Sequence, residues 1–381
     1  MKPVKILHVV GAMNRAGTET MLMNIYRDID RTKIQFDFIS YSDQEADYDQ
    51  EIERLGGRVI RLGKTTSIKQ IYQAIKMYGP YHAIHAHTLF HCGIASIAAR
   101  LAGVKIRIAH AHTTLDKSDR LLRKLYIRFM RRLIKRFSTH LLACSAGAGR
   151  YLFGKSALTK STYTYFPNVI DFESFLDVSK TAIGKFKLET GLGKHLIIGH
   201  AGRFIEAKNH AFLVEVTKFL QEKDPAVKVL FAGDGDLKDQ MVAEVKKAGL
   251  GDTIHFLGKR NDISTVLHSM DVFVFPSLYE GLGLVLLEAQ ASGIPCVVSE
   301  AIQPEADIGL GLMKALPLAV GPSAWADNII SLAANKGRSQ HDIITAFEQK
   351  RYSIIQGIAT LMEIYQLKAG GVYERNTGRL F

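Results

Sequence analysis

Residues 271–299 read DVFVFPSLYEGLGLVLLEAQASGIPCVVS. The stretch opens with a β-branched and aromatic apolar run at 272–276 and closes with a second apolar run at 295–299. Between them, residues 283–292 form an apolar helical segment, which the glycine and proline of SGIP bring to an end. Strand, helix and strand in this order predict a parallel βαβ unit.

The same alternation continues along the chain. We expect strands in the first half at 5–10, 36–41, 58–62, 81–87, 106–112, 140–145 and 163–166. In the second half we expect strands at 196–202, 227–233, 253–258, 272–276 and 295–299, with helices near 209–222, 237–248, 262–269 and 283–292. Such alternation is typical of parallel sheets covered by helices.

The chain of 381 residues has the length of two domains. Pro167 and a polar, glycine-containing segment interrupt the alternation between the halves. The sequence therefore predicts an α/β protein with two doubly wound, Rossmann-like domains facing each other across a cleft. We place the first domain at 1–175 and the second at 176–354, with a carboxyl-terminal helix at about 355–381 that packs back on the first.

The net charge is +12, and all of the excess lies in the first half. Residues 1–175 hold 27 Lys and Arg against 14 Asp and Glu, a balance of +13, whereas residues 176–381 hold 22 against 23, a balance of −1. No segment approaches the roughly 20 consecutive apolar residues of a membrane span. Three widely spaced cysteines predict neither a disulfide framework nor a cysteine metal site, and we expect a cytoplasmic protein.

One segment concentrates the positive charge, LLRKLYIRFMRRLIKRF at 121–137, which we treat as a basic helix at 120–137. At about 100° per residue it has an apolar and a basic face. We expect the apolar face to pack on its own domain and the basic face to lie against an anionic membrane surface, at the inner face of the cell membrane. No nucleic-acid-binding module accompanies the charge. The apolar face comprises Leu122, Leu125, Tyr126, Phe129, Leu133 and Phe137, and the basic face Lys124, Arg128, Arg131, Arg132 and Lys135.

The octapeptide GRYLFGKS at 149–156 fits the phosphate-loop pattern G-x-x-x-x-G-K-[ST]. A phosphate loop uses small residues, so that its backbone N–H groups can converge on phosphate, and it leads into a long helix. Here the intervening residues are bulky, and the segment after Ser156 is short and β-branched. We expect instead a helix that Ser145 caps, that runs through Leu152 and that stops at Gly154.

Two acidic residues flank the glycines of YEGLGLVLLE. Glu280 follows a predicted strand, and Glu288 lies one to two turns into the next helix. A carboxylate can accept two hydrogen bonds side by side, which suits the vicinal hydroxyls of a sugar or a ribose, and the start of a helix can meet an anion. The alternative is an acid that complements the helix dipole together with a second acid on a solvated face.

A second loop carries cations. GHAGRFIEAKNHAF places Arg203 and Lys208 between a strand and a helix. A planar guanidinium and a mobile ammonium could together hold a diphosphate, whereas either one alone would be an ordinary surface charge. Cations on one strand–loop–helix unit and carboxylates on another predict a nucleotide-sugar site.

The blocks GRFIEAK, FAGDG, FLG and DVFVFPSLYEGLGLVLLEAQASGIPCVVS resemble, in this order, the donor domain of the retaining glycosyltransferases of family four, which have the GT-B fold. In the first half, NRAGTETMLMN resembles that family's glycine-rich first loop, AHAHTT the strand that ends in its active-site histidine, and FPNVID its hinge-side motif. The resemblance extends from about residue 5 to about residue 365.

Position by position, the resemblance implies a role for each candidate residue. Arg203 and Lys208 would hold the donor diphosphate and stabilise it as it departs. Glu280 would bind hydroxyls of the transferred sugar, and Glu288 would bind ribose. His112 would lie beside the transferred sugar and help to place it. Gly17 would let the amino-terminal loop approach the donor closely. The phosphate-facing amides would be those of Gly281, Gly283 and Leu284.

Cations and helix ends replace a metal ion in this fold, so the resemblance implies no metal and no cofactor beyond the nucleotide-sugar co-substrate, most commonly a UDP-sugar. It also implies retention of anomeric configuration. Because the motifs hold no convincing carboxylate nucleophile, we hypothesise front-face attack by the acceptor hydroxyl. The expected acceptor is a glycan or a polyprenyl-linked sugar in bacterial capsule or exopolysaccharide assembly.

Two alternatives stay open. IHAHT at 84–88 and AHAHT at 109–113 each place two histidines on one side of a strand, which suits a metal-dependent hydrolase. A nucleotide-sugar epimerase could use the same fold for another reaction. The histidines of the hydrolase alternative are His85, His87, His91, His110 and His112.

Overall fold

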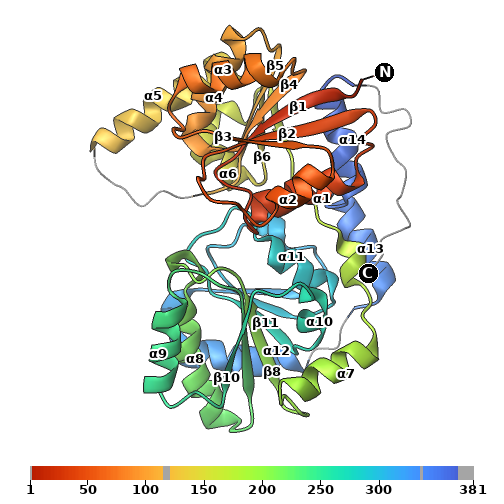
Figure 1. Ribbon diagram of the computed structural model, residues 1–381. Coiled ribbons are helices and arrows are strands. Elements are labelled where there is room, and N and C mark those ends of the chain that lie inside the picture. Colours follow the sequence, from red (N-terminus) through yellow and green to blue (C-terminus); the bar gives the residue numbers. More distant parts are fainter. Residues whose placement is uncertain (1, 115–120, 335–337, 368–381) are drawn as a thin grey trace. The chain divides into compact units, whose positions relative to one another are not determined.

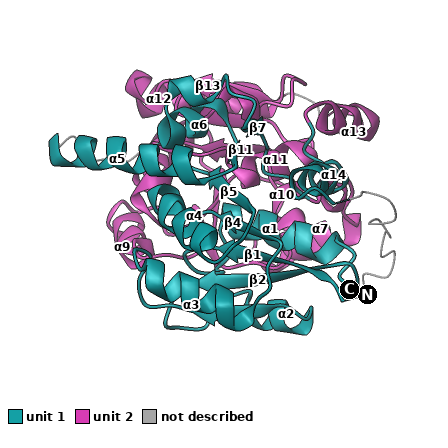
Figure 2. Ribbon diagram, turned by 90° about the horizontal axis from the view of Figure 1, so that it is seen from above, with its two compact units in different colours: residues 1–170, 351–381 teal, residues 171–350 magenta. Residues whose placement is uncertain are grey.

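The computed structural model describes residues 2–114, 121–334 and 338–367. The chain divides into two compact units, shown in two colours in Figure 2. Unit 1 comprises residues 1–170 and 351–381, and unit 2 comprises residues 171–350. Both are parallel α/β structures, which is the predicted fold class.

Unit 1 is built on a sheet with the strand order β3-β2-β1-β4-β5-β6-β7 (Figure 1). Every pairing in it is parallel, and its central strands are almost wholly buried, as expected when helices cover both faces. The strands are β1 (Val4–Val9), β2 (Ile34–Ser40), β3 (Arg58–Arg61), β4 (Ala83–Ala86), β5 (Ile106–Ala111), β6 (His140–Ala143) and β7 (Tyr163–Tyr165).

The helices of unit 1 follow the strands in alternation. The last of them returns from the carboxyl-terminal segment: α14 contacts α1, and a Cβ on Gly357 would lie 2.6 Å from Val169 Cγ1, so the backbones approach closely there. The helices are α1 (Gly17–Asp28), α2 (Asp49–Arg54), α3 (Ile68–Tyr78), η1 (Leu89–His91), α4 (Cys92–Leu101), α5 (Leu121–Phe137), α6 (Ala146–Phe153), η2 (Lys155–Ala157) and α14 (Ile354–Ile364). Residues 368–381 of the expected carboxyl-terminal helix and Arg120 of the basic helix lie outside the described residues.

Unit 2 is built on a parallel sheet with the order β10-β9-β8-β11-β12-β13. Its strands are β8 (Ile197–Ala201), β9 (Lys228–Ala232), β10 (Ile254–Gly258), β11 (Val272–Phe275), β12 (Cys296–Ser299) and β13 (Met313–Leu316). Its helices are η3 (Phe172–Phe175), α7 (Lys180–Glu189), η4 (Glu206–Lys208), α8 (His210–Lys223), α9 (Lys238–Lys247), α10 (Ile263–His268), α11 (Leu284–Ala291), η5 (Pro304–Ala306), η6 (Leu318–Val320), α12 (Gly321–Ala333) and α13 (Gln340–Gln349).

The twelve strands expected from the sequence all form, with ends that differ from the expected ones by one or two residues. The helix at 145–154 is confirmed as well: the Ser145 hydroxyl accepts a hydrogen bond from the Ala148 N–H, and Gly154 ends the helix with φ 86°. GRYLFGKS is therefore the end of a helix followed by a 3₁₀ turn. Strand β13 and helices α12 and α13 were not predicted.

The predicted packing of the basic helix is correct only in part: Tyr126, Leu133 and Phe137 are half-buried, and a Cβ on Gly93 of α4 would lie 3.2 Å from Leu133 Cβ. Its buried residues are Met130 and Ile134, whereas Leu122, Leu125 and Phe129 of the expected inner face are 81%, 56% and 54% exposed. Helix α4 decides which side packs, because a Cβ on Gly93 would lie 3.2 Å from Ile134 N. Arg131, expected on the outer basic face, instead donates to the Tyr151 carbonyl oxygen, with Nε 3.1 Å away.

No helix in the described residues combines the length and the apolar character needed to cross a membrane. The three cysteines are described and buried, and none of them forms a disulfide.

Candidate active site

The loops that follow β8 and β11 carry the candidate donor-site residues of unit 2. These strands are neighbours at the point where the strand order of the sheet reverses, and ligands of doubly wound sheets bind at such a point, outside the carboxyl ends of the strands. Lys208 ends η4 after β8, and Glu280 follows β11. The ammonium Nζ of Lys208 lies 2.5 Å from Oε1 of Glu280, and the two side chains are only 15% and 13% exposed. Sequence reasoning named both residues, and the structure brings them into contact.

Backbone hydrogen bonding holds the two loops together. The Leu278 N–H donates to the Ala207 carbonyl oxygen at 2.8 Å, and the Asn209 side-chain amide donates to the Pro276 carbonyl oxygen at 3.2 Å. Asn209 adopts left-handed backbone angles, with φ 54°, between η4 and α8. The Lys208 ammonium also lies 4.5 Å from the centre of the Phe275 ring, within the range of a cation–π interaction. Lys208 is thus positioned by the fold before any ligand arrives.

Helix α11 begins at the end of the same β11 loop. Gly283 has φ 84°, and a Cβ there would lie 3.0 Å from the Phe275 ring, so a larger residue would be strained and crowded. The first N–H groups of a helix, here those of Leu284 and Val285, have no carbonyl partner within the helix. Glycine at 283 therefore allows the left-handed turn beside Phe275 from which the helix starts.

Glu288 lies one turn into α11 and is half-buried. Burial raises the pKa of its carboxyl group to about 7. A carboxyl group that titrates near neutral pH, on the helix that starts beside Glu280, can accept hydrogen bonds from a diol most strongly once it has lost its proton.

Arg203 follows β8 and is exposed; it forms no ion pair within the described part of the chain. Two glycines of the loop after β9 pack closely against the backbone of the loop that carries Arg203. A Cβ on Gly233 would clash with the Gly202 carbonyl oxygen, and one on Gly235 would lie 2.8 Å from Phe204 N. The FAGDG motif thus has a packing role beside the loop that presents the guanidinium.

Five histidines gather in unit 1 where β1, β4 and β5 adjoin. Strand register places His8 directly opposite His85, and β5 runs beside β4. Two hydrogen-bonded chains of imidazoles result. In the first, Tyr365 Oη lies 2.9 Å from His85 Nδ1, and His85 Nε2 lies 3.2 Å from His110 Nδ1.

The second chain runs from His8 to the candidate residue His112. His8 Nδ1 lies 3.2 Å from His87 Nε2, and His87 Nδ1 lies 2.9 Å from His112 Nε2. A neutral imidazole offers one donor and one acceptor, so the hydrogen bonds from ring to ring in both chains need no charge. His8 Nε2, at the end of the second chain, is buried and has no hydrogen-bond partner among the described residues. Burial lowers the pKa of His8 to about 3 and that of His112 to about 3, with the Asn168 side chain acting in the opposite direction on His112. Burial also lowers the pKa values of His85, His87 and His110 well below the ordinary value.

Two sets of three imidazoles lie close enough to hold a metal ion, namely His8, His85 and His87, and His87, His110 and His112. His91, which the hydrolase alternative included, belongs to neither set among the described residues. Neither set contains a carboxylate, so a divalent ion there would have no acidic ligand from these groups.

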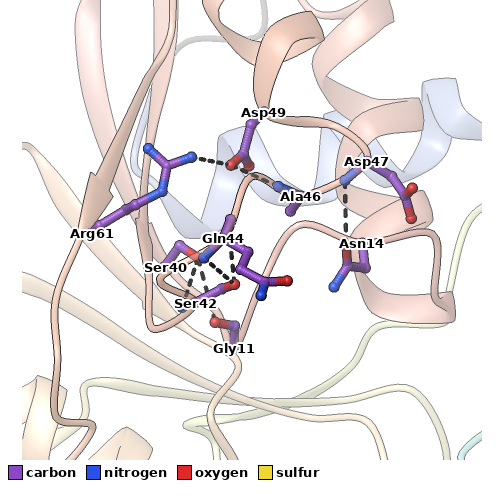
Figure 3. A network of polar contacts seen from close by, with 9 residues as sticks. All are labelled: Gly11, Asn14, Ser40, Ser42, Gln44, Ala46, Asp47, Asp49 and Arg61. Carbon is purple, nitrogen blue, oxygen red and sulfur yellow. Dashed lines mark hydrogen bonds and ion pairs between the residues drawn. The ribbon is translucent and has the colours of Figure 1, made fainter. Parts of the chain in front are cut away.

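The amino-terminal loop with Gly17 is anchored to the loop after β2 (Figure 3). The Arg15 N–H donates to Asp47 Oδ2 at 2.9 Å, and the Asp47 N–H donates to Asn14 Oδ1 at 3.3 Å. Asp49, which follows the loop after β2, accepts a hydrogen bond from the Arg61 guanidinium at 2.7 Å and so links the end of that loop to β3. Gly17 is the first residue of α1 and is exposed. Figure 3 also labels Gly11, Ser40, Ser42, Gln44 and Ala46 of this network.

Sequence reasoning missed His8 and Tyr365 as members of the histidine cluster. The H-x-H pattern revealed His85 with His87 and His110 with His112, but it could not reveal that β1 lies next to β4. Gly17 and His112 belong to unit 1, and the other candidate residues belong to unit 2. Those of unit 2 are Arg203, Lys208, Glu280, Gly281, Gly283, Leu284 and Glu288.

Two parallel Rossmann-like units in one chain are the architecture of the glycosyltransferases of the GT-B fold. Family models agree: Glycosyltransferase Family 4 matches residues 15–174, and Glycosyl transferases group 1 matches residues 185–349. The chain belongs to this glycosyltransferase family.

Relatives cover almost the whole chain. It is 40% identical over 371 residues to the putative glycosyltransferase EpsF of Bacillus subtilis. This match covers 95% of this chain and 96% of EpsF. It is 26% identical over 376 residues to the capsular polysaccharide biosynthesis glycosyltransferase CapH of Staphylococcus aureus, over 96% of this chain and 99% of that protein. The crystal structure of Anabaena HepE in complex with UDP-glucose has the same fold, with a TM-score of 0.76 at 20% identity, over 95% of this chain and 99% of HepE.

Proposed function

We propose that this glycosyltransferase moves a sugar from a UDP-sugar to a glycan or lipid-linked sugar, with retention of anomeric configuration and without a metal ion. The biological setting would be bacterial exopolysaccharide or capsule assembly. The name of the relative CapH, a capsular polysaccharide biosynthesis glycosyltransferase, supports the setting. The UDP-glucose complex of the structural neighbour HepE supports the donor. The observation that carries the proposal is the Lys208–Glu280 pair at the switch point of unit 2.

The pair suits the two ends of the bond that breaks. When the donor arrives, the Lys208 ammonium, which has three N–H donors, would also bond to the β-phosphate while it stays beside Glu280, with Arg203 as the second cation, and would stabilise the charge on the leaving diphosphate. Glu280 would then accept hydrogen bonds from hydroxyls of the sugar. Because cations and helix N–H groups neutralise the phosphates, no divalent ion is required in this scheme.

Helix α11 would bind the nucleotide end of the donor. The N–H groups near Gly281, Gly283 and Leu284 would face a phosphate, and Glu288 would accept hydrogen bonds from the ribose hydroxyls. These contacts would leave the sugar carbon open on the side from which the diphosphate departs. We propose front-face attack by the acceptor hydroxyl, since no side chain of the described site has been assigned as a nucleophile.

Unit 1 would provide the acceptor side. His112 would lie beside the transferred sugar, and its imidazole ring would be neutral because burial lowers its pKa. Gly17 would allow the first loop to approach the donor closely. We assign the acceptor side to residues 1–175 with the carboxyl-terminal helix and the donor side to 176–354. The charge excess of the first half favours a lipid-linked acceptor at an anionic membrane surface.

Calorimetric titration with UDP, GDP and ADP tests the donor site directly. We expect UDP to bind, Glu288→Ala to weaken binding by about tenfold or more, and Lys155→Ala, in the GRYLFGKS segment, to bind as the wild type. NMR of the product then reports the anomeric configuration. Inversion of configuration, or a requirement for added divalent ions, would contradict the proposed mechanism.

The metal-dependent hydrolase and the epimerase are distinguished by their products. Incubation of a UDP-sugar without acceptor gives free sugar or a changed UDP-sugar in those two cases, and mainly unchanged donor for a transferase. The imidazole groups of unit 1 keep the hydrolase in consideration, and elemental analysis of protein purified without added metal decides whether a metal occupies them.

A further inference from the structure

Helix α5 leaves large apolar side chains in solvent. Leu121, Leu122, Leu125 and Phe129 are 73%, 81%, 56% and 54% exposed. Exposed large apolar residues occur elsewhere among the described residues, but each of those stands alone on its helix, strand or loop. Four on two turns of one helix form a patch, and a patch indicates a binding surface where single residues do not.

The helix carries basic residues along the same stripe. Positions 121, 125, 129, 132 and 136 recur at spacings of four and three, which places them on one side of a helix. The stripe begins with Leu121, Leu125 and Phe129 and continues with Arg132 and Arg136, which are exposed. At 1.5 Å per residue it is about 22 Å long. Arg128 and Lys135 are exposed on its border.

The opposite side of α5 holds the helix on unit 1. Met130 and Ile134 are 4% and 0% exposed, and α5 packs on α4 and contacts α6. The basic residues of this side have protein partners: the Arg123 guanidinium lies 4.9 Å from the centre of the Tyr126 ring, and Arg131 donates to the Tyr151 carbonyl oxygen. Figures 1 and 2 both show the amino-terminal part of α5 standing away from the other helices of its unit.

We propose that α5 inserts its apolar amino-terminal half into the interface of an anionic lipid bilayer, with its basic carboxyl-terminal half on the lipid headgroups. The four exposed apolar residues would enter the acyl boundary, and Arg128, Arg132, Lys135 and Arg136 would meet phosphate. An interfacial helix of this kind gains from buried apolar area and from attraction to anionic lipid together. The proposal rests on the proposed function only for its purpose, which is to hold unit 1 beside a lipid-linked acceptor.

Charge favours a bilayer over a second copy of this chain. Two copies that met through this stripe could bury only the apolar halves, and the basic side chains would gain no partner of opposite charge, since a two-fold interface repeats the same patch. A bilayer containing anionic lipid instead supplies the opposite charge beside an apolar layer. The insertion also differs from purely electrostatic adsorption, in which the leucines would stay in water.

Vesicle binding tests the insertion. The full chain is centrifuged with vesicles of phosphatidylcholine containing phosphatidylglycerol, and with phosphatidylcholine alone. We expect Leu122→Ser/Leu125→Ser/Phe129→Ser to reduce the partition coefficient by about tenfold or more. A matched triple variant of exposed residues on other helices, Met77→Ser/Leu101→Ser/Leu188→Ser, should bind as the wild type.

Charge is tested with a second pair of variants. Replacement of Arg128, Arg132, Lys135 and Arg136 by Gln should abolish the preference for anionic vesicles. Replacement of four exposed lysines elsewhere, Lys160, Lys180, Lys246 and Lys247, removes the same charge and should leave that preference intact. Binding of the wild type should weaken with salt yet persist in part, because the apolar contribution is not screened.

Insertion depth has its own readout. Trp325 is the single tryptophan and is fully buried in unit 2, so a second tryptophan reports its own surroundings. Phe129→Trp should shift its emission to the blue on anionic vesicles and be quenched by brominated acyl chains. Leu101→Trp, 64% exposed on α4 in the same unit, should do neither.

The proposal is overturned if the wild type does not bind anionic vesicles, or if the triple variant of Leu122, Leu125 and Phe129 binds them equally well. It is also overturned if the wild type is a dimer in solution and this triple variant is a monomer. None of these measurements uses a donor sugar. The vesicle results can therefore fail while transfer to a water-soluble acceptor is observed, and they can succeed in a protein for which no transfer is found.

Discussion

The two sheets have related strand orders, which reverse between β1 and β4 in unit 1 and between β8 and β11 in unit 2. Different kinds of side chain lie near the two reversal points. Between β1 and β4 in unit 1 stand neutral imidazoles, with His8 opposite His85 and hydrogen bonds from ring to ring. On the loops that follow β8 and β11 in unit 2 lie an ammonium and a carboxylate, those of Lys208 and Glu280, 2.5 Å apart. The fold offers the same place twice, and the side chains decide what it can bind.

The difference teaches which unit suits a diphosphate. A chain of neutral imidazoles presents no fixed charge to an anion, and burial opposes its protonation. The unit 2 site has a cation held in place and a helix start beside it. The comparison can be tested by titrating one region and removing charge from the other.

The largest expected effect is the loss of unit 1 stability in acid. The five imidazoles, of which His8, His85 and His110 are buried and the other two half-buried, have pKa values below the ordinary 6.5, so the unfolded chain takes up protons that the folded chain does not. Their contribution is present above pH 6.5 and is lost as the pH falls from 6.5 towards 3. Between pH 7 and 5.5 we expect the free energy of unfolding of unit 1 to fall, by at most about 1.36 kcal/mol per histidine per pH unit.

Hydrogen exchange followed by mass spectrometry measures this effect separately in each unit. Unit 2 has two buried histidines with lowered pKa values, His200 and His210, so its peptides should lose less protection. His8→Phe removes one titrating ring and should make the pH dependence of unit 1 shallower. Equal losses in the two units would contradict the importance of the cluster.

The next effect is on transfer. Lys208→Ala should lower kcat/KM by about 10²–10³-fold, because a preorganised cation at developing charge contributes on that scale. Lys208→Arg should retain part of the activity. Lys218→Ala removes an exposed lysine that also forms a carboxylate pair, with Glu215 at 2.7 Å, and should leave kcat/KM unchanged. Equal losses in the two alanine variants would remove the special role of the Lys208–Glu280 pair.

A smaller effect concerns nucleotide affinity and pH. With a pKa of about 7, Glu288 is mostly protonated at pH 6 and mostly ionised at pH 8. If the ionised carboxylate accepts the ribose hydroxyls, the affinity for UDP-glucose should rise by about tenfold across this range. Calorimetry of Glu288→Gln should show a flat profile, since the amide does not titrate. A wild-type profile that is equally flat would mean that Glu288 does not contact the nucleotide.

Much of the fold could be predicted because local signals and global packing agree. Ser145 and Gly154 mark both ends of α6, and alternating apolar runs mark the central strands. Strand β13 escaped because it is a short edge strand, MKAL, whose middle residues Lys314 and Ala315 are exposed, so it lacks the apolar run of a buried strand.

Tertiary information explains two further misses, the packing of α5 and the place of His8 in the histidine cluster. The apolar residues of α5 span more than half of the helix circumference, and only the close approach of Gly93 on α4 selects Ile134 and Met130 as the inner side. Strand order, which no local pattern contains, brings His8 to the H-x-H pairs. The sequence assigned Lys208 and Glu280 to one nucleotide-sugar site on two separate strand–loop–helix units, whereas their contact required the structure.

The smallest expected effect separates packing from phosphate binding in GRYLFGKS. Lys155 is exposed in the 3₁₀ turn η2, so Lys155→Ala should change the free energy of unfolding by less than about 0.5 kcal/mol. Gly149, the first glycine of the pattern, lies inside α6, where a Cβ would come within 3.1 Å of the Tyr163 ring and 3.2 Å of Ala143 Cβ. Gly149→Val should therefore lower the melting temperature, because the added side chain must displace β7 or β6 from the helix. Thermal unfolding with and without ATP distinguishes the two causes: a phosphate loop would lose an ATP-dependent shift in both variants, whereas a helix end shows no such shift in the wild type and a stability loss only at Gly149.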